Sequence, residues 1–322
     1  MTDKIRTAVI GVGYLGRFHA QKYAALPDAE LVAVVDVDRS TAEAVANECD
    51  TQALTDYQEL LDKVDAVSIV VPTQLHYEVA KAFLQSGTHV LLEKPITTTV
   101  AEADELIEIA DRSGLVLQVG HLERFNSAVM ALEGVLAQPL FIESHRLAAF
   151  KPRGTDVSVV LDLMIHDIDI IQNLVGSPIA DIHANGVSVL TDEVDIANAR
   201  LEFENGCVAN VTASRVSMKA QRKMRIFQND AYISIDFQDK ILSVHRKGDG
   251  EMFPGIPEIT SEESIFENSD AIMAEAEAFL GAIRNGTRPP VSGREGRQAL
   301  ATALRITDLL TKQAAAVPGE KR

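Results

Sequence analysis

The stretch TAVIGVGYLG, residues 7–16, determines how the first part of this chain folds. Residues 7–10 are apolar and mostly β-branched, which predicts a short buried strand. That strand runs directly into the pattern G-x-G-x-x-G, and a helical stretch follows. A strand, a glycine-rich turn and a helix in this order are typical of a dinucleotide-binding fold.

Each glycine of the pattern has a physical task. Gly11 allows the tight turn, Gly13 lets the backbone approach a pyrophosphate, and Gly16 lets the helix pack against the strand. The helix opens at Tyr14 and Leu15, and its free N–H groups and positive dipole end favour phosphate. We therefore predict that these five residues bind the pyrophosphate of the cofactor.

A second apolar run, residues 31–35, ends in Asp36. This carboxylate lies about 20 residues past the glycines, where it can hydrogen-bond the ribose hydroxyls. It would also repel the 2′-phosphate of NADP. The sequence therefore favours NAD as the cofactor, with Arg39 as a nearby cation that softens this preference.

Length and composition limit the class of protein. The chain has 322 residues, of which 46% are hydrophobic, and this is enough for two domains that each have a core. The net charge of −17 argues against a nucleic acid or an anionic membrane surface as partner. A small-molecule substrate remains the expected partner.

Targeting signals and cysteine usage point to the cytoplasm. No apolar run approaches the roughly 20 residues that span a bilayer, and the first strand begins so early that it leaves no room for a signal peptide. Cys49 and Cys207 lie far apart and have no metal-type spacing. We expect two free thiols in a reducing compartment.

Residues 1–120 alternate strand and helix patterns. The predicted strands are residues 7–10, 31–35, 51–53, 66–71, 88–92 and 115–119. The predicted helices after the first are residues 40–48, 56–61, 74–85 and 100–112. Continuous apolar strands between helices predict a parallel sheet covered on both faces. We expect residues 1–120 to form a doubly wound Rossmann domain.

Residues 121–322 have a different character. The predicted strands are residues 140–148, 179–190, 196–204, 207–216, 223–228, 232–237 and 241–246. The predicted helices are residues 127–137, 155–175, 271–284 and 294–312, and residues 248–267 predict a loop. Asn205-Gly206 predicts a two-residue hairpin turn with positive φ at both positions. We expect an α+β domain with a large, mostly antiparallel sheet flanked by helices, and its open face is available for a homodimer or homotetramer.

Two segments carry polar residues at strand ends, where doubly wound sheets bind their ligands. Pro72, Thr73 and His76 follow the fourth strand. They predict a cofactor-lining segment, and equally a strand-to-helix turn that Thr73 caps.

The second segment is Glu93-Lys94-Pro95, which follows the next strand. Lys94 at this strand tip would lie over the nicotinamide end of the cofactor and donate a hydrogen bond to a reacting oxygen. The alternative is a surface ion pair between Glu93 and Lys94. Adjacent residues of an extended segment point in opposite directions, which weakens that alternative.

A third group of polar residues lies in the predicted helix 155–175. Asp162, His166, Asp169 and Asn173 recur at spacings of four, three and four, so they share one helix face. A narrow polar stripe in an apolar helix favours a cleft over bulk water. Asp162 could orient His166 as an acid/base, or the histidine could be a buried core residue that a neighbouring acid satisfies. We expect no metal, because His166 and Asp162 supply only two ligands.

Together, the glycine motif, Glu93-Lys94-Pro95 and the pattern Asp162-x-x-x-His166 resemble the Gfo/Idh/MocA family of sugar and polyol oxidoreductases. The resemblance covers essentially the whole chain. It implies that Lys94 lies near the hydride-transfer centre, that His166 is the acid/base and that Asp162 is its companion.

Three further segments, residues 120–126, 145–147 and 151–156, resemble members that oxidise the 3-hydroxyl of UDP-N-acetylglucosamine. In some bacteria those enzymes feed a 3-amino sugar into lipid A. The resemblance makes Arg124, Asn126 and Arg153, together with His166, the expected substrate-binding residues.

The charges agree with a sugar nucleotide, because arginine donates paired hydrogen bonds to pyrophosphate oxygens. Arg124, Arg146, Lys151 and Arg153 are cations in an otherwise acidic chain. Their alternative role is solvated surface or an oligomer contact. For the second basic cluster, residues 215–225, we favour that alternative.

The sequence thus predicts an NAD-dependent oxidation of a secondary sugar hydroxyl. His166, held by Asp162, would take the hydroxyl proton, and Lys94 would hydrogen-bond the same oxygen. One alternative is a dehydrogenase of a free sugar or a cyclitol such as myo-inositol, which would not need the basic residues. Another is an NAD-binding regulator without catalysis, which would not need the reactive pair that this chain keeps.

Overall fold

The protein is represented by a computed structural model that describes residues 4–151, 157–267 and 269–316. The chain forms two compact units, which are taken separately below. The first unit combines Met1–Phe125 with Asp270–Leu300, and the second combines Asn126–Ser269 with Ala301–Arg322. Among the described residues, no helix has both the length and the apolarity that crossing a bilayer requires.

The first unit contains a six-stranded parallel sheet with the strand order β3-β2-β1-β4-β5-β6. Its strands are β1 (Ile5–Ile10), β2 (Ala29–Val35), β3 (Gln52–Leu54), β4 (Ala66–Ile69), β5 (His89–Glu93) and β6 (Leu117–Gly120). The order reverses between β1 and β4, so the ends of these two strands form the switch point at which such sheets bind ligands. The predicted doubly wound Rossmann fold is confirmed.

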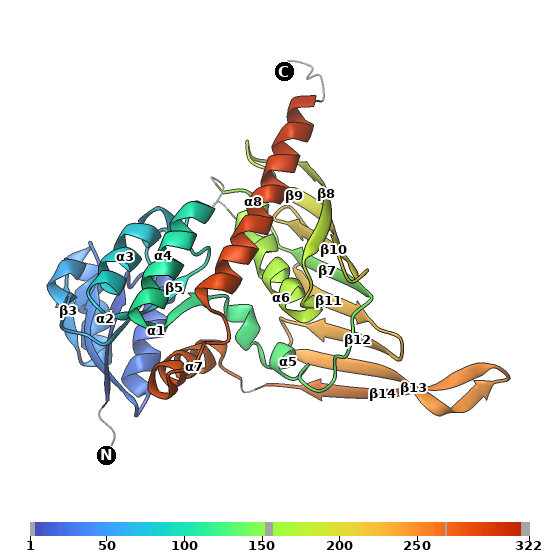
Figure 1. Ribbon diagram of the computed structural model, residues 1–322, viewed down its shortest axis with the longest axis horizontal. Coiled ribbons are helices and arrows are strands. Elements are labelled where there is room, and N and C mark those ends of the chain that lie inside the picture. Colours follow the sequence, from blue (N-terminus) through green and yellow to red (C-terminus); the bar gives the residue numbers. More distant parts are fainter. Residues whose placement is uncertain (1–3, 152–156, 268, 317–322) are drawn as a thin grey trace. The chain divides into compact units, whose positions relative to one another are not determined.

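Helices cover both faces of this sheet (Figure 1). They are α1 (Tyr14–Ala25), α2 (Arg39–Cys49), α3 (His76–Gln85), α4 (Val100–Ser113) and α7 (Ala271–Asn285), with the short helices η1 (Tyr57–Leu60), η2 (Thr73–Leu75) and η3 (Leu122–Phe125). Local sequence fixes several of their ends. Thr99 and Glu102 form a capping box at the start of α4, and Gly114 ends it in the left-handed conformation.

Helix α7 belongs to the first unit although it comes after the second unit in the chain. Its residues Ala276, Phe279 and Leu280 are buried in the same core cluster as Val9 of β1 and Tyr23 of α1. The sequence division at residue 120 assigned this helix to the second domain. That division stays a prediction, and local pattern could not show that the apolar face of α7 packs on α1.

The second unit contains an eight-stranded sheet with the order β14-β13-β12-β11-β7-β10-β9-β8. Its strands are β7 (Phe141–Leu147), β8 (Ile179–Val187), β9 (Ile196–Phe203), β10 (Val208–Ser214), β11 (Gln221–Phe227), β12 (Ala231–Asp236), β13 (Ile241–Phe253) and β14 (Ile256–Ile265). Only the β7–β10 pair is parallel. The expected large, mostly antiparallel sheet is confirmed.

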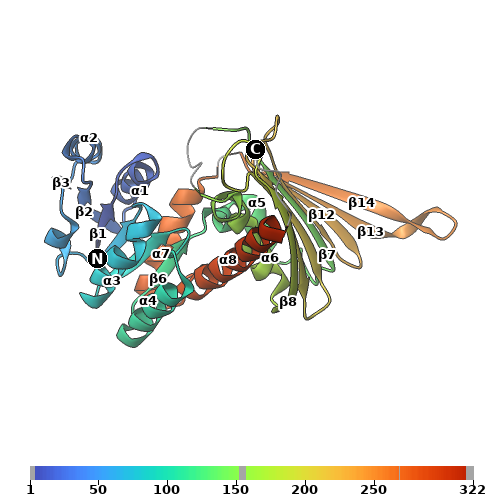
Figure 2. The same cartoon turned by 90° about the horizontal axis from the view of Figure 1, so that it is seen from above.

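The helices of this unit are α5 (Ser127–Met130), η4 (Val160–Met164), α6 (Ile165–Val175) and the part of α8 (Gly293–Ala316) that follows Leu300. Figures 1 and 2 show α6 and this part of α8 on the same side of the sheet. Gln172 of α6 donates to the hydroxyl of Thr302 of α8 at 2.9 Å. The inner sheet face and these helices enclose the apolar core of the unit.

Three local predictions were wrong in this unit. Residues 248–267, expected as a loop, mostly extend β13 and form β14. Gly255 lies in the turn that joins these two strands and has a positive φ of 78°. Charged and polar residues on both faces of this exposed ribbon conceal the alternation on which strand prediction depends. At Asn205-Gly206 only Gly206 has positive φ, because the turn between β9 and β10 is longer than two residues.

The predicted helix 127–137 is also shorter, since α5 ends at Met130 and turns follow. Within the predicted helix 155–175, residues 152–156 lie outside the described part, and η4 is a π-helix that precedes α6. A π-helical turn is wider than an α-helical one and often occurs at functional sites. The even α-helical spacing assumed for Asp162 therefore does not hold across this junction.

Candidate active site

The glycine turn of the first unit has the geometry that its sequence predicts. Gly11 has φ +84°, and a Cβ there would lie 2.7 Å from the carbonyl oxygen of Val70. A Cβ on Gly16 would lie 1.9 Å from the carbonyl oxygen of Gly11. Both positions therefore exclude any side chain. Gly13 has no neighbouring heavy atom within 4 Å of such a Cβ, so its outer side is open.

Helix α1 begins beside this open side. Its N-cap is Gly13, and no side chain caps the first turn. The first N–H groups of a helix have no partner within the helix, and their dipole favours an anion. A cavity of about 520 Å³ borders Gly13 and Tyr14 and extends to Ser40 and Thr41 of α2. The turn therefore offers both room and donors for a phosphate group.

Asp36 follows β2 and is tied to the glycine turn. Its Oδ2 accepts the N–H of Val12 and its Oδ1 accepts the N–H of Asp38, each at 3.0 Å. These two bonds fix the carboxylate, and each oxygen keeps a lone pair for a ribose hydroxyl. Arg39, the first residue of α2, is largely exposed and lies 3.5 Å from Glu43.

The segments after β4 and β5 are braced against each other by His76. Its Nδ1 lies 2.8 Å from the carbonyl oxygen of Pro95, and its Nε2 lies 2.9 Å from that of Val71. Burial lowers the pKa of His76, so the neutral ring donates to one of these carbonyls at a time. The predicted cofactor contacts of Pro72, Thr73 and His76 stay predictions, and the buried ring has a clear structural role.

Lys94 lies at the end of β5 and is followed by a cis peptide bond to Pro95. The Lys94 side chain is half-buried. Its backbone N–H donates to Oε2 of Glu93 at 3.2 Å. Glu93 is 9% exposed, and its Oε1 lies 3.5 Å from Nε2 of the buried His19. The carboxylate of Glu93 thus faces the buried His19, and the alternative of an ion pair between Glu93 and the Lys94 side chain stays a prediction.

In the second unit, His166 is the second residue of α6 and Asp162 lies in the π-helix before it. His166 and Asp162 are half-buried, Asp169 is buried, and Asn173 is exposed. The proposed contact between Asp162 and His166 stays a prediction. The four residues predicted to form one stripe therefore differ in burial.

A buried ion pair fixes the start of α6. Arg146 of β7 donates to both carboxylate oxygens of Asp167, at 2.9 and 3.0 Å, and both residues are at most 3% exposed. The Arg146 guanidinium also lies over the ring of Phe237 at 5.4 Å. Because Asp167 is next to His166 in the helix, this pair fixes the first turn of α6, from which His166 projects. Arg146 is therefore neither solvated surface nor available to a substrate phosphate.

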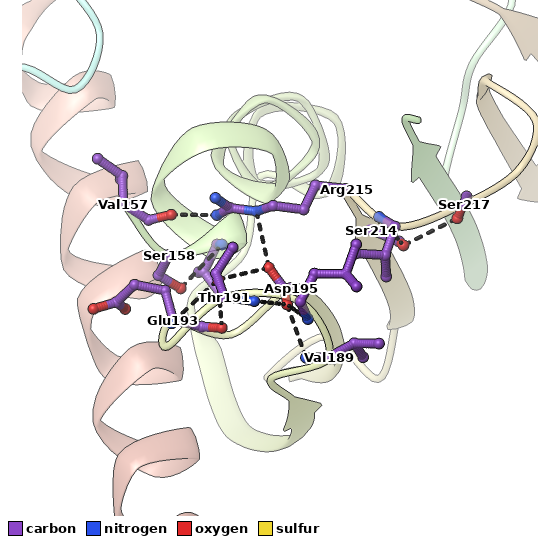
Figure 3. A network of polar contacts seen from close by, with 12 residues as sticks. Val157, Ser158, Val189, Thr191, Glu193, Asp195, Ser214, Arg215 and Ser217 are labelled. Atoms are coloured by element: carbon purple, nitrogen blue, oxygen red, sulfur yellow. Dashed lines mark hydrogen bonds and ion pairs between the residues drawn. The ribbon is translucent and has the colours of Figure 1, made fainter. Parts of the chain in front are cut away.

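Asp195 organises a second buried network in this unit (Figure 3). Its Oδ2 accepts the N–H groups of Val189, Leu190 and Thr191 at 2.6 to 2.9 Å. Burial alone would raise the pKa of Asp195, but these N–H groups and the Thr191 hydroxyl together lower it to about 2.

Arg215 connects this network to the segment that precedes η4. Its Nε lies 3.8 Å from Oδ1 of Asp195, and its guanidinium donates to the carbonyl oxygen of Val157. Arg215 is 6% exposed. The expectation of solvated surface for this cluster is therefore wrong at Arg215, because the residue faces a carboxylate 20 positions earlier in the chain, which local spacing does not reveal.

Two of the predicted substrate residues also make structural contacts. Arg124 of η3 donates to the carbonyl oxygen of Pro290 at 3.2 Å. Asn126 caps α5 through Ala128 N–H and donates to the carbonyl oxygen of Phe237, both at 3.1 Å. Their contacts with substrate stay predictions, and Arg153 lies outside the described residues.

Comparison with known proteins agrees with this geometry. Residues 5–121 match the model of the oxidoreductase family with an NAD-binding Rossmann fold, and residues 129–234 match the GFO/IDH/MocA C-terminal domain. UDP-N-acetylglucosamine 3-dehydrogenase of Acidithiobacillus ferrooxidans is 44% identical over 94% of this chain and 96% of its own length. The chain belongs to the Gfo/Idh/MocA family of oxidoreductases.

Solved structures and more distant relatives are also similar to this chain. A crystal form of the same Acidithiobacillus ferrooxidans enzyme superposes with a TM-score of 0.91 at 43% identity, covering 97% of this chain and 99% of that chain. The scyllo-inositol 2-dehydrogenase (NAD(+)) of Bacillus subtilis is 27% identical over 91% of this chain and 90% of its own length. A levoglucosan dehydrogenase in complex with NADH, at 20% identity and a TM-score of 0.85 over 97% of this chain and 98% of that chain, shares the fold.

As a member of this family, the protein is a dehydrogenase with NAD as its cofactor. The residues present fit NAD: a Cβ at Gly13 would fill the open side of the turn, α1 offers uncapped N–H groups, and Asp36 offers carboxylate oxygens. Sequence reasoning missed His19, Asp167 and Asp195. Each is paired with a residue distant in sequence, so only the fold brings the partners together.

Proposed function

We propose that this protein oxidises the 3-hydroxyl of UDP-N-acetylglucosamine to a ketone with NAD. The observation that carries the proposal is the 44% identity, over nearly the full length of both chains, to an enzyme of that name. The chain also keeps the residues that this chemistry needs, Lys94 and His166.

Each residue has a defined task in the proposed reaction. When bound, NAD supplies the acceptor for the hydride that leaves the substrate carbon. His166 accepts the proton of the hydroxyl and is oriented by Asp162. Lys94 donates a hydrogen bond to the same oxygen and stabilises its developing negative charge.

In this proposal, separate sets of residues bind the cofactor and the substrate. Gly11, Gly13, Tyr14, Leu15 and Gly16 bind the pyrophosphate of NAD, and Asp36 binds the adenosine ribose. The segments Pro72–His76 and Glu93–Pro95 line the nicotinamide side. Arg124, Asn126 and Arg153 bind the sugar nucleotide, whose phosphates suit arginine donors.

A free cyclitol is the second candidate substrate, and the 27% identical scyllo-inositol 2-dehydrogenase (NAD(+)) favours it. Such a substrate carries no phosphate, so an alanine at Arg153 would leave its oxidation nearly intact. With a sugar nucleotide the same change would raise KM by roughly tenfold or more, as expected for the loss of a charge-assisted bond.

The decisive experiment gives the purified protein NAD with UDP-N-acetylglucosamine, myo-inositol or glucose. Products are identified by mass spectrometry, since an unfavourable equilibrium would keep the NADH absorbance small. Loss of two hydrogens from the sugar nucleotide alone supports the proposal. Turnover of free polyols alone would mean that the substrate is a polyol and not the sugar nucleotide, and the roles proposed for Lys94 and His166 would stand.

We also propose that the protein works as a homodimer or homotetramer in the cytoplasm. In both views the helices of the second unit lie on one side of its sheet, which leaves the other side for a second copy. Cys49 and Cys207 are free thiols, as expected in a reducing compartment.

A further inference from the structure

Three ionisable side chains meet in the interior of the first unit. They are His19 of α1, Glu93 at the end of β5 and Glu275 of α7, with exposures of 1%, 9% and 0%. One nitrogen or oxygen of each lies within 4.8 Å of the others. Two carboxylates this close in an apolar interior repel each other unless a proton or a cation lies between them.

The hydrogen bonds around the cluster show which of its groups lacks a donor. Oε2 of Glu93 accepts the N–H of Lys94, and Oε1 faces His19. In the described part of the chain, no group donates a hydrogen bond to either carboxylate oxygen of Glu275.

The ring nitrogens of His19 have no hydrogen-bond partner among the described residues, whereas two other nearby polar side chains are bonded elsewhere. The Tyr23 hydroxyl is bonded to Ser68 at 2.8 Å, and the Gln118 amide donates to the backbone oxygen of Glu275 at 3.1 Å. The cluster therefore has more acceptors than donors. A proton on Glu275 corrects this imbalance, because a protonated carboxyl becomes a donor.

We propose that Glu275 is protonated at neutral pH and that, with His19, it is a positioning residue that holds Glu93 and, through it, the backbone of Lys94. The inference rests on the role proposed for Lys94. The carboxylate of Glu93 lies close to the backbone of Gly120, where a Cβ would be 2.8 Å from its Oε1, so glycine at this position makes room for it. The orientation of the Glu93 carboxylate governs the hydrogen bond that it accepts from Lys94 N–H.

The surroundings of Glu275 favour the neutral form. Burial, and then the charge of Glu93, raise the pKa of Glu275 well above its ordinary value. On α1 and η3, the helices packed most closely against α7, the other ionisable residues are Tyr14, Arg17, His19, Lys22, Tyr23, Glu123 and Arg124. Lys22 is paired with Asp270, at 2.7 Å.

Infrared spectroscopy tests the proton directly and needs no substrate. The difference spectrum between wild type and E275Q at neutral pH should contain the carbonyl band of a buried carboxylic acid. A difference that contains only carboxylate bands would overturn the proposal. A stoichiometric metal in the purified wild type, measured by elemental analysis, would overturn it as well, because a cation would then take the place of the proton.

Kinetics test the positioning role. E275Q keeps the size and neutrality of the protonated acid, so its kcat should stay within about threefold of wild type. E275L removes the polar group and should lower kcat by roughly tenfold or more, with the affinity for NAD unchanged. Equal losses in E275Q and E275L would contradict the proposal. Thermal unfolding shows whether each variant is folded.

T88V is the matched control, because it removes a buried polar group at the other end of β5, where the Thr88 hydroxyl donates to Val64 at 3.3 Å. It should leave kcat unchanged, and a loss equal to that of E275L would mean that any buried polar change in this unit lowers activity. A wild type without turnover would contradict the proposed function, while the infrared band would still report on Glu275.

Discussion

Asp36 combines a structural role with a proposed binding role in one carboxylate. Each of its oxygens accepts one backbone N–H, from Val12 and from Asp38. A carboxylate held in this way presents its remaining lone pairs in a fixed direction, which suits two adjacent ribose hydroxyls. Its charge disfavours a phosphate in the same place.

We therefore expect Asp36→Ser to change the choice of cofactor. The ratio of kcat/KM for NAD to that for NADP should fall by roughly tenfold or more, because one carboxylate–ribose bond is lost and one repulsion is removed. Steady-state kinetics with both cofactors measure the ratio. Asp38→Ser is the control, since it removes a charge from the same loop and keeps a side chain that can cap α2. An equal change in both variants would assign the effect to net charge.

In the proposed reaction, Lys94 donates a hydrogen bond to the reacting oxygen. Lys94→Met keeps much of the aliphatic stem and removes the ammonium group, so kcat should fall by about 100-fold or more. NAD binding, measured by calorimetry, should stay within about threefold, because the glycine turn and Asp36 supply most of the contacts. Lys81→Met, on the surface of α3, serves as the control. Turnover near the wild-type rate in K94M would remove Lys94 from the mechanism.

The structure explains the residue types of the predicted site only where the sequence signals were local. Gly11, Gly16 and Asp36 were assigned from spacing, and the backbone geometry explains why those residue types occur there. Glu275 gave no such signal, since it is separated from His19 by almost the whole chain. Burial of a charged residue depends on which helix packs against which, and a single sequence does not contain that information.

At the scale of elements, two buried ion pairs hold α6 and the segment before it. Arg146–Asp167 attaches α6 to β7, and Asp195–Arg215 attaches the carbonyl of Val157 to the loop before β9. The sequence predicted β7, β9 and α6 but not these attachments. It also assumed α-helical spacing through η4, where a π-helix shifts the phase of the side chains.

Asp195 allows a test of this attachment through pH. We expect Asp195→Asn to lower the free energy of unfolding by about 3 kcal/mol at neutral pH, because Arg215 is left buried beside a neutral group. The folded pKa of about 2 lies below the unfolded value of about 3.9. The stabilisation by the ionised carboxylate is therefore complete above the unfolded pKa and is lost as pH falls toward 2.

Denaturant unfolding of wild type and Asp195→Asn between about pH 7 and pH 2 measures this difference. The difference in the free energy of unfolding between the two proteins should be constant near neutrality and should become smaller below about pH 4. Asp249→Asn, which changes an exposed carboxylate on β13, is the control and should show a small difference throughout. If the difference in free energy of unfolding between wild type and Asp195→Asn increased in acid, it would contradict the lowered pKa of Asp195.

At the scale of the whole molecule, the chain is strongly acidic, with a net charge of −17. Like charges spread over a surface oppose self-association, so any interface between copies has to bury apolar surface to overcome them. The ribbon of β13 and β14 beyond the rest of the sheet offers such surface. It carries Met252, Phe253, Ile256 and Ile259, each more than half exposed.

The outer part of the ribbon also lacks a third neighbouring strand. Strand β12 pairs with β13 only as far as Arg246, so the remainder of the β13–β14 hairpin has two strands alone (Figure 2). Two-stranded hairpins are marginally stable in water, and clustered exposed apolar side chains mark interaction sites. A second copy of the chain would supply both a third strand beside the hairpin and an apolar surface against its exposed side chains.

We therefore expect the double variant Phe253→Glu, Ile256→Lys to dissociate the proposed oligomer. Light scattering after size exclusion should give a dimer or tetramer mass for wild type and the mass of one chain for the variant at micromolar concentration. Met218→Glu, at a fully exposed position between β10 and β11, is the control and should keep the wild-type mass. The opposite charges leave the net charge of the double variant unchanged, so dissociation would report on the apolar contact. A monomeric wild type would exclude the oligomer, and an unchanged mass in the variant would move the interface to the open face of the sheet.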